Sequence, residues 1–268
     1  MFEVIAANFH VGIAIFFILG CLFGSFANVL IVRMPKGENI AVPRSFCRSC
    51  KKTIKWYHNI PVLSWILLGG KCAYCRAPYS IRYPLTELLM GIAFAATFYV
   101  CGWSFTLIEY TYFVFALITC AFIDLDHMIL PDKFTLSGIV IGLIGAAINP
   151  ERDFLQSLYG VLMGGGFLWA VAYLYFAFRG REGMGGGDIK LLAWIGAMLG
   201  WQAIPIIILL SSVVGALVGI ILAIRTKDGM KLAIPFGPFL VAATLFYIFV
   251  DGDRIGEWYL SIHGFGPT

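Results

Sequence analysis

Two aspartates at the edges of apolar segments are the side chains in this sequence best suited to do chemistry. Asp124 ends the apolar segment that contains Thr119, and Asp188 follows three glycines and opens another. Acidic residues near hydrocarbon are costly, so their positions indicate a function. Two facing carboxylates that cannot both ionise share one proton. The ionised one can take a proton from water while the other donates to a carbonyl oxygen, which predicts peptide-bond hydrolysis.

The spacing leaves alternatives to this interpretation. Asp126 and Asp132 lie near Asp124 in the sequence, and either could be the partner instead. Carboxylates at helix ends can also be solvated groups without a catalytic role. The glycines before Asp188 would give an extended substrate backbone room to approach, although close helix packing explains them as well. These glycines are Gly185, Gly186 and Gly187.

Four of the seven cysteines form a second chemical pattern, two Cys-x-x-Cys pairs with 21 residues between them. They are Cys47 with Cys50 and Cys72 with Cys75. Each pair can turn two thiolates toward one ion, and four sulfurs complete the tetrahedron that Zn²⁺ prefers. Because no position is left for water, we expect the zinc to be structural. Two disulfides, or an empty or redox-active tetrad, are the alternatives.

The composition places the chain in a membrane. It is 60% hydrophobic and only 13% charged, about half the charge of an average domain. This excludes a soluble enzyme with a solvated surface and an intrinsically disordered chain. The apolar runs are continuous rather than alternating, which excludes an outer-membrane barrel. We predict an all-α polytopic membrane protein with about eight transmembrane helices.

The predicted spans are residues 11–32, 84–101, 105–123, 134–149, 157–178, 189–200, 203–224 and 232–250. The sixth span is too short to cross by itself, so whether it crosses fully stays open. The segments outside these spans carry the basic residues that set the orientation. We divide the chain into a first transmembrane helix (1–32), a tetra-cysteine loop (33–83) and a core of seven helices (84–268).

Ten of the nineteen lysines and arginines lie in the tetra-cysteine loop. With eight spans, seven more fall on the same side of the membrane and two on the other, so this side is expected to be cytoplasmic. Both termini are then periplasmic. The reducing cytoplasm disfavours disulfides in the loop. Anionic membrane lipids are sufficient partners for the basic residues, and no nucleic-acid partner is expected.

Several longer motifs accompany the aspartates and cysteines. They are Gly24–Pro35, Arg82–Glu87, Ile123–Asp132, Glu182–Leu191 and Pro235–Pro238. Together with the tetra-cysteine loop, these motifs resemble the bacterial type IV prepilin peptidases, an intramembrane aspartic protease family. The resemblance extends along nearly the whole chain.

The resemblance implies a bifunctional enzyme of the bacterial inner membrane. Such an enzyme cleaves the basic leader from a type IV prepilin or pseudopilin at the cytoplasmic face, after a glycine. It then methylates the new N-terminal amine with S-adenosylmethionine. The resemblance also implies that the catalytic pair is Asp124 and Asp188, rather than Asp126 or Asp132. The intact cysteine loop is typical of the bifunctional type, found in pilus and type II secretion systems.

A few charged residues near the aspartates are candidates for substrate binding. Asp126, Asp132 and Glu182 could attract the basic leader, or could hold helix ends beside basic residues such as Lys190. Lys190 and the three glycines complete the expected substrate-binding set.

The methyl-donor pocket has no sequence signature. Asn28 and Glu87 are candidates because they are polar and lie inside or at the edge of spans, with interhelical hydrogen bonding as the alternative.

Three other classes of protein remain possible from the residues alone. A transporter could use the acids to relay protons or cations, but the two halves show no internal repeat. A membrane metalloprotease would need an open metal site, and the sequence has no His-Glu-x-x-His. A methyltransferase alone would not need the aspartate pair.

Overall fold

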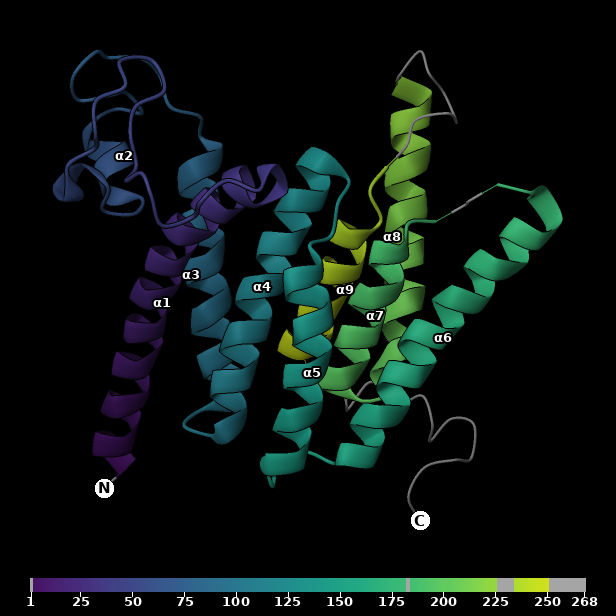
Figure 1. The fold of residues 1–268 in the computed structure, drawn as a ribbon. Helices are drawn as coiled ribbons and strands as arrows, with labels where there is room; N and C mark the ends of the chain where they lie inside the picture. Colours follow the sequence, from purple (N-terminus) through teal and green to yellow (C-terminus); the bar gives the residue numbers. More distant parts are fainter. Residues whose placement is uncertain (1, 182–183, 226–233, 251–268) are drawn as a thin grey trace. The chain divides into compact units, whose positions relative to one another are not determined.

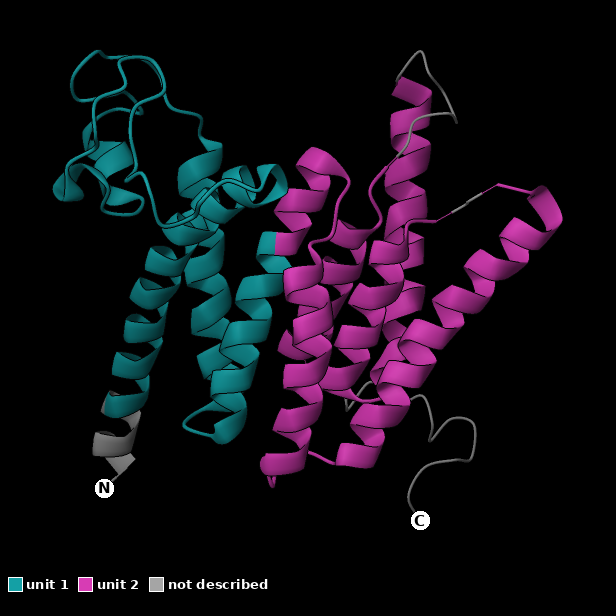
Figure 2. Cartoon of the chain, viewed as in Figure 1, with its two compact units in different colours: residues 1–119 teal, residues 120–268 magenta. Residues whose placement is uncertain are grey.

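The computed structural model describes residues 2–181, 184–225 and 234–250, and this part of the chain contains helices, turns and no strand. The structure therefore confirms the all-α prediction. The chain separates into two compact units, residues 1–119 and 120–268, which Figure 2 draws in different colours. Helix α4 (Phe105–His127) runs through the boundary between them.

The first unit is built on an antiparallel pair of helices, α1 (Phe2–Arg33) and α3 (Arg82–Cys101), which lie side by side in Figure 1. Glycines let the two backbones approach closely. A Cβ on Gly20 would lie 2.7 Å from the Cα of Gly91, and one on Gly24 would lie 2.6 Å from the Cα of Glu87. Small residues at such contacts stabilise helix pairs in membranes, where dispersion replaces the hydrophobic effect.

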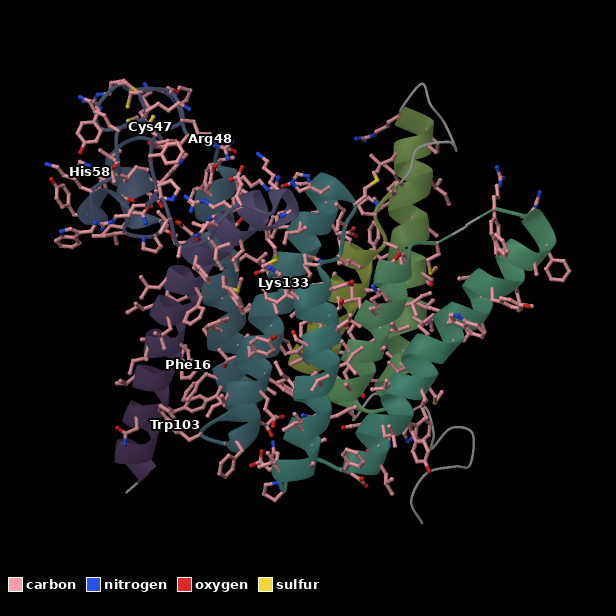
Figure 3. The ribbon with its side chains drawn as sticks, in the orientation of Figure 1. Phe16, Cys47, Arg48, His58, Trp103 and Lys133 are labelled. Carbon is pink, nitrogen blue, oxygen red and sulfur yellow. The ribbon has the colours of Figure 1, made fainter. Side chains whose placement is uncertain are left out.

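Aromatic side chains pack between α1 and α3 near the C-terminal end of α3. The rings of Phe16 and Phe98 stack with their centroids 5.0 Å apart, and Trp103 meets Phe16 edge-on at 6.2 Å. Figure 3 labels Phe16 and Trp103 in this cluster. Between α1 and α3 lie the tetra-cysteine loop and its short elements. These are η1 (Met34–Lys36), η2 (Trp56–His58) and α2 (Leu63–Leu67).

The second unit contains five helices besides the end of α4, and four of them pack around the short helix α7 (Gly186–Leu199). These four are α5 (Asp132–Ile148), α6 (Phe154–Arg179), α8 (Ala203–Arg225) and α9 (Gly237–Phe249). Helix α7 contacts the other four, and every residue from Leu191 to Met198 is buried. Its 14 residues extend about 21 Å, which is less than the roughly 30 Å of a bilayer core. The weak sixth span of the sequence is therefore an inner helix covered by its neighbours.

Glycine contacts hold α7 in place. Gly160 of α6 faces Gly196 of α7, and a Cβ on either would collide with the carbonyl group of the other. On the opposite side, a Cβ on Gly138 of α5 would collide with the buried Trp194 indole ring of α7. The backbones of α6 and α7 thus touch, and a large side chain fills the space that a glycine leaves on α5.

Each of the eight predicted spans corresponds to one described helix. Within the described residues, five helices have both the length and the apolar composition needed to cross a membrane. They are Asn8–Lys36, Arg82–Cys101, Phe105–His127, Phe154–Arg179 and Ala203–Arg225. Helices α5, α7 and α9 are shorter, with 17, 14 and 13 residues. Their length alone does not confirm eight crossings.

We predict that Gly160→Val destabilises the fold because the new side chain pushes α6 away from α7. The expected loss is roughly 1–3 kcal/mol, the usual cost of overpacking a tight contact. It can be measured as a lower unfolding midpoint of the detergent-solubilised protein. Gly166→Val on the same helix is the control, since a Cβ there meets nothing within 4 Å. Equal stability of the two variants would contradict the prediction.

Candidate active site and candidate metal centre

The buried carboxylate of the predicted pair is Asp124, near the end of α4. Its side chain is only 5% exposed, whereas Asp126 on the same turn is exposed. The Oδ2 atom of Asp124 accepts a hydrogen bond from the backbone N–H of Gly237, at 3.1 Å. A buried carboxylate needs such a donor, because leaving it without partners would cost several kcal/mol.

Asp188 lies in the first turn of α7 and is partly buried. Its carboxyl group is close enough to Asp124 for the two to interact electrostatically. The side chain of Leu130 lies close to the backbone near both carboxylates. A Cβ on Gly187 would lie 3.0 Å from Leu130 Cβ, and one on Gly237 would lie 3.4 Å from Leu130 Cδ2. Three elements therefore meet here: the end of α4 and the starts of α7 and α9.

The three glycines before Asp188 differ in their surroundings. Gly185 and Gly186 are exposed, and a Cβ on Gly186 would meet nothing within 4 Å. Gly187 packs against Leu130. Open backbone is thus available on the outer side of Asp188, as an extended substrate would need. Glu182, the third acid predicted near this site, lies outside the described residues.

Asp132 and Lys190 form an ion pair with each other. Lys190 Nζ lies 2.7 Å from Asp132 Oδ1 and links the second turn of α7 to the first residue of α5. The two side chains are 37% and 58% exposed. Exposed pairs of this kind contribute about 0–1 kcal/mol. The pair is therefore exposed to solvent, two residues along α7 from Asp188.

The predicted metal ligands gather in the tetra-cysteine loop. The sulfurs of all four cysteines lie within 4.8 Å of one another, and Cys47 Sγ is 3.8 Å from Cys75 Sγ. Figure 3 labels Cys47 among the loop side chains. All seven cysteines of the chain are free thiols, so the two-disulfide alternative is not the arrangement found. Four thiols at this spacing could hold one metal ion.

The two Cys-x-x-Cys pairs have the same local backbone. Cys47 N–H donates to Lys52 O, and Lys51 N–H donates to Cys47 O. In the second pair Cys72 N–H likewise donates to the carbonyl oxygen of the residue five positions later, and Arg76 N–H donates to Cys72 O. Lys51 and Arg76 occupy equivalent positions and have positive φ, 59° and 60°. The two Cys-x-x-Cys segments thus adopt the same turn.

Backbone donors favour thiolates at the first cysteine of each pair. The N–H groups of Cys50 and Ser49 lower the pKa of Cys47 to about 6. Those of Cys75 and Tyr74 lower the pKa of Cys72. Because the thiolate is the metal-binding form, these turns suit a cation held by sulfur.

Comparisons with known proteins agree with this arrangement. The bacterial peptidase A24 N-terminal domain matches residues 18–101, and the type IV leader peptidase family matches residues 111–220. A prepilin leader peptidase/N-methyltransferase of Aeromonas hydrophila is 38% identical over 276 residues, which cover 91% of this chain and 92% of the relative. This chain belongs to the type IV leader peptidase family.

Further relatives with the same description support the membership. The one from Stutzerimonas stutzeri is 36% identical over 282 residues and covers 97% of both chains. The one from Pseudomonas aeruginosa is 35% identical over 271 residues, or 92% of this chain and 93% of the relative. No solved structure matches the chain. The resemblance drawn from the sequence motifs is confirmed.

The two polar residues considered for a cofactor pocket have other partners in this type IV leader peptidase. Asn28 Nδ2 donates to Tyr83 O at 3.1 Å, which joins α1 to α3. The buried Glu87 carboxylate accepts from the N–H of Val62 at 2.7 Å and from the Ser25 hydroxyl. The Asn28 bond and the Ser25–Glu87 bond are interhelical, as the alternative interpretation described, whereas the Val62–Glu87 bond joins α3 to the loop.

Sequence reasoning missed the role of two residues in this leader peptidase site. Leu130 stood inside the Ile123–Asp132 motif, but its contacts with two other helix ends have no signature in the sequence. Gly237 stood inside Pro235–Pro238, a short Pro-Phe-Gly-Pro motif that indicates a helix start. The motif could have drawn attention to this turn, but not to its hydrogen bond with Asp124.

Proposed function

We propose that this chain cleaves the leader of type IV prepilins or pseudopilins and then N-methylates the new terminus, in the bacterial inner membrane. The observation that carries the proposal is the convergence of Asp124 and Asp188 at the ends of two different helices. The names of the relatives and the two matched domains support the same activities. The transporter and metalloprotease alternatives have no comparable support.

In the proposed mechanism one carboxylate takes a proton from water, whose oxygen attacks the carbonyl carbon at the cleavage site. The other carboxyl group donates its proton to the carbonyl oxygen. When the intermediate collapses, the first group gives its proton to the leaving nitrogen. The second takes back the hydroxyl proton as the C–N bond breaks. The leader gains a carboxyl terminus, the product gains an amine, and the pair again holds one proton.

The substrate side of the proposal follows from charge and backbone access. A basic leader cannot easily cross the membrane, so cleavage belongs on the side that the positive-inside rule assigns to the cytoplasm. Gly185 and Gly186 offer uncovered backbone beside Asp188. The exposed Asp126 and Asp132 supply negative charge near the aspartate pair, where leader cations would compete with Lys190 for Asp132. Both termini are then periplasmic.

Zn²⁺ is the metal that we assign to the four-cysteine cluster, because a set of four thiolates suits its tetrahedral coordination. Four protein ligands leave no position for water, so the ion would hold the two cysteine turns together rather than take part in hydrolysis. The loop has a small core, and a metal compensates for that. Its residues form the proposed cytoplasmic loop (33–83), between the first helix (1–32) and the core (84–268).

S-adenosylmethionine is the methyl donor in this proposal. Asn28 and Glu87 do not fit a role in binding it, since the contacts described above already engage their polar groups. We therefore derive no step of methylation from them, and the methyl-transfer site is not assigned to residues.

We predict that Asp124→Asn and Asp188→Asn each strongly reduce leader cleavage, because neither amide can carry the shuttled proton. The expected loss is roughly 10²–10⁴-fold in kcat for general acid–base catalysis. The assay is mass analysis of the N-terminus after incubation with a prepilin. Methylation of a pre-cut substrate should persist in both variants.

Asp153→Asn is the matched control for these two changes, since asparagine can keep the N-cap bonds that Asp153 makes to Leu155 and Gln156. Wild-type cleavage by either catalytic variant would refute the peptidase mechanism. Loss of an ion flux without loss of cleavage would instead support the transporter.

We predict that neutralising Asp126, Asp132 and Glu182 together raises the apparent KM for a prepilin and weakens its dependence on ionic strength. The reason is that exposed charges attract a basic leader only within a Debye length. The kcat should change little. If KM and its salt dependence both stay at wild-type values, the acids do not contribute to leader binding.

We predict one zinc ion per chain by metal analysis of the purified protein. Replacing Cys47 and Cys72 by serine together should remove the metal and make the loop more sensitive to limited proteolysis. Cys101→Ser is the control, because Cys101 lies outside the cluster. A metal-free preparation with four titratable thiols in the loop would overturn the zinc assignment.

A further inference from the structure

The Pro235–Pro238 turn has a direct contact with the catalytic pair that the mechanism above does not use. Helix α9 begins at Gly237, after the N-cap residue Phe236. The N–H groups of Phe239 and Leu240 both donate to Phe236 O, and Pro238 has no N–H. From Gly237 to Leu240, therefore, only the N–H of Gly237 is directed at a side chain, and that side chain is Asp124.

This contact requires glycine. A Cβ on residue 237 would lie 2.6 Å from Asp124 Oδ2 and 3.3 Å from Asp124 Cγ. A separation of 2.6 Å is shorter than a carbon and an unbonded oxygen tolerate, so any side chain would displace the carboxylate. The glycine thus brings its N–H to Oδ2 and leaves Oδ1 for water or substrate.

The hydrogen bond also distinguishes the two aspartates. A donor aimed at a carboxylate stabilises the ionised form over the neutral one. Within the described part of the chain, the Asp188 carboxylate has no such donor. Both aspartates lie near the positive end of a helix, α9 for Asp124 and α7 for Asp188, so the helix dipoles do not separate them. The direct bond from Gly237 does.

We propose that Gly237 is a positioning residue that holds Asp124 as the ionised, water-activating member of the pair and leaves the shared proton on Asp188. This inference rests on the proposed peptidase function and assigns a role to each carboxylate. Asp124 then takes the proton from water, and Asp188 protonates the carbonyl oxygen. On collapse of the intermediate the same protons move to the leaving nitrogen and back to Asp188.

Among the residues that the structure describes, few other titratable groups lie around Asp124. Asp188 faces it from α7, and Cys120 lies one turn away on its own helix. The first turn of α9 brings no acidic residue. Helix α5 begins with Asp132, which is paired with Lys190. Among the described residues, a change at Gly237 therefore acts first on Asp124, the side chain that its N–H contacts.

The test is Gly237→Ala, assayed with a synthetic prepilin peptide that has a basic leader, a glycine at the cut and an apolar segment. A carboxylate displaced by about 1 Å should lower kcat on the order of 10²-fold, with KM within about twofold of wild type. The acid limb of the pH profile of kcat/KM should move to higher pH, because the ionised base has lost its donor. Methylation of the pre-cut peptide should continue.

Gly219→Ala is the matched control, since a Cβ there would meet only Ile234 Cδ1 at 3.7 Å. Unchanged cleavage by Gly237→Ala would overturn the proposal. So would equal loss of cleavage and methylation, which would make Gly237 a purely structural residue. A shift of the alkaline limb instead of the acid limb would reverse the roles of the two aspartates. Cleavage at the wild-type rate by Asp124→Asn would refute the proposed peptidase function itself, whatever Gly237→Ala does.

Discussion

The close approach of a buried carboxylate to the first residue of another helix constrains the second unit. Asp124 can be buried at the end of α4 only if a donor comes to it, and the donor is the backbone of Gly237. This fixes the start of α9 at the level of Asp124. Helix α7 must begin at the same level for Asp188 to join them, with Leu130 packed between the three helix ends. The same contacts therefore determine both the packing of this region and the placement of its two carboxylates.

The position of α7 depends on contacts that lie far from the aspartates. Gly160 and Gly196 bring the backbones of α6 and α7 together, and the Trp194 ring occupies the space beside Gly138 on α5. A short helix surrounded on all sides has little freedom to slide along its axis. Glycines on three helices thus contribute to the geometry of the site without belonging to it.

The sequence was sufficient for some of these features and insufficient for others. Apolar runs predicted the long helices but not the short ones of the tetra-cysteine loop, because length and apolar composition identify membrane spans. The cysteine spacing predicted the cluster. The bond between Asp124 and Gly237 joins residues 113 positions apart, and no periodicity encodes such a pair. Burial also could not be foreseen: α7 looked like a weak span because a helix shielded by other helices need not match the bilayer thickness.

Glu87 shows how an intramembrane acid can be structural rather than functional. An acid at this depth suggests a binding site by default. Here it accepts the N–H of Val62, a residue with φ of 60° and ψ of −52°, an uncommon conformation for a β-branched side chain. The carboxylate thereby secures a strained turn of the tetra-cysteine loop against α3. Its polarity serves the attachment of the loop, which neither the spacing nor the composition could reveal.

The duplicated cysteine turn has a consequence for how this loop can vary. Each copy closes its own hydrogen bonds within a few residues, so neither copy depends on the length of the chain between them. Insertions or deletions in that connection would leave both sulfur pairs intact, provided that Val62 still reaches Glu87. The loop can therefore change in length among descendants of this sequence while its two Cys-x-x-Cys turns remain able to come together.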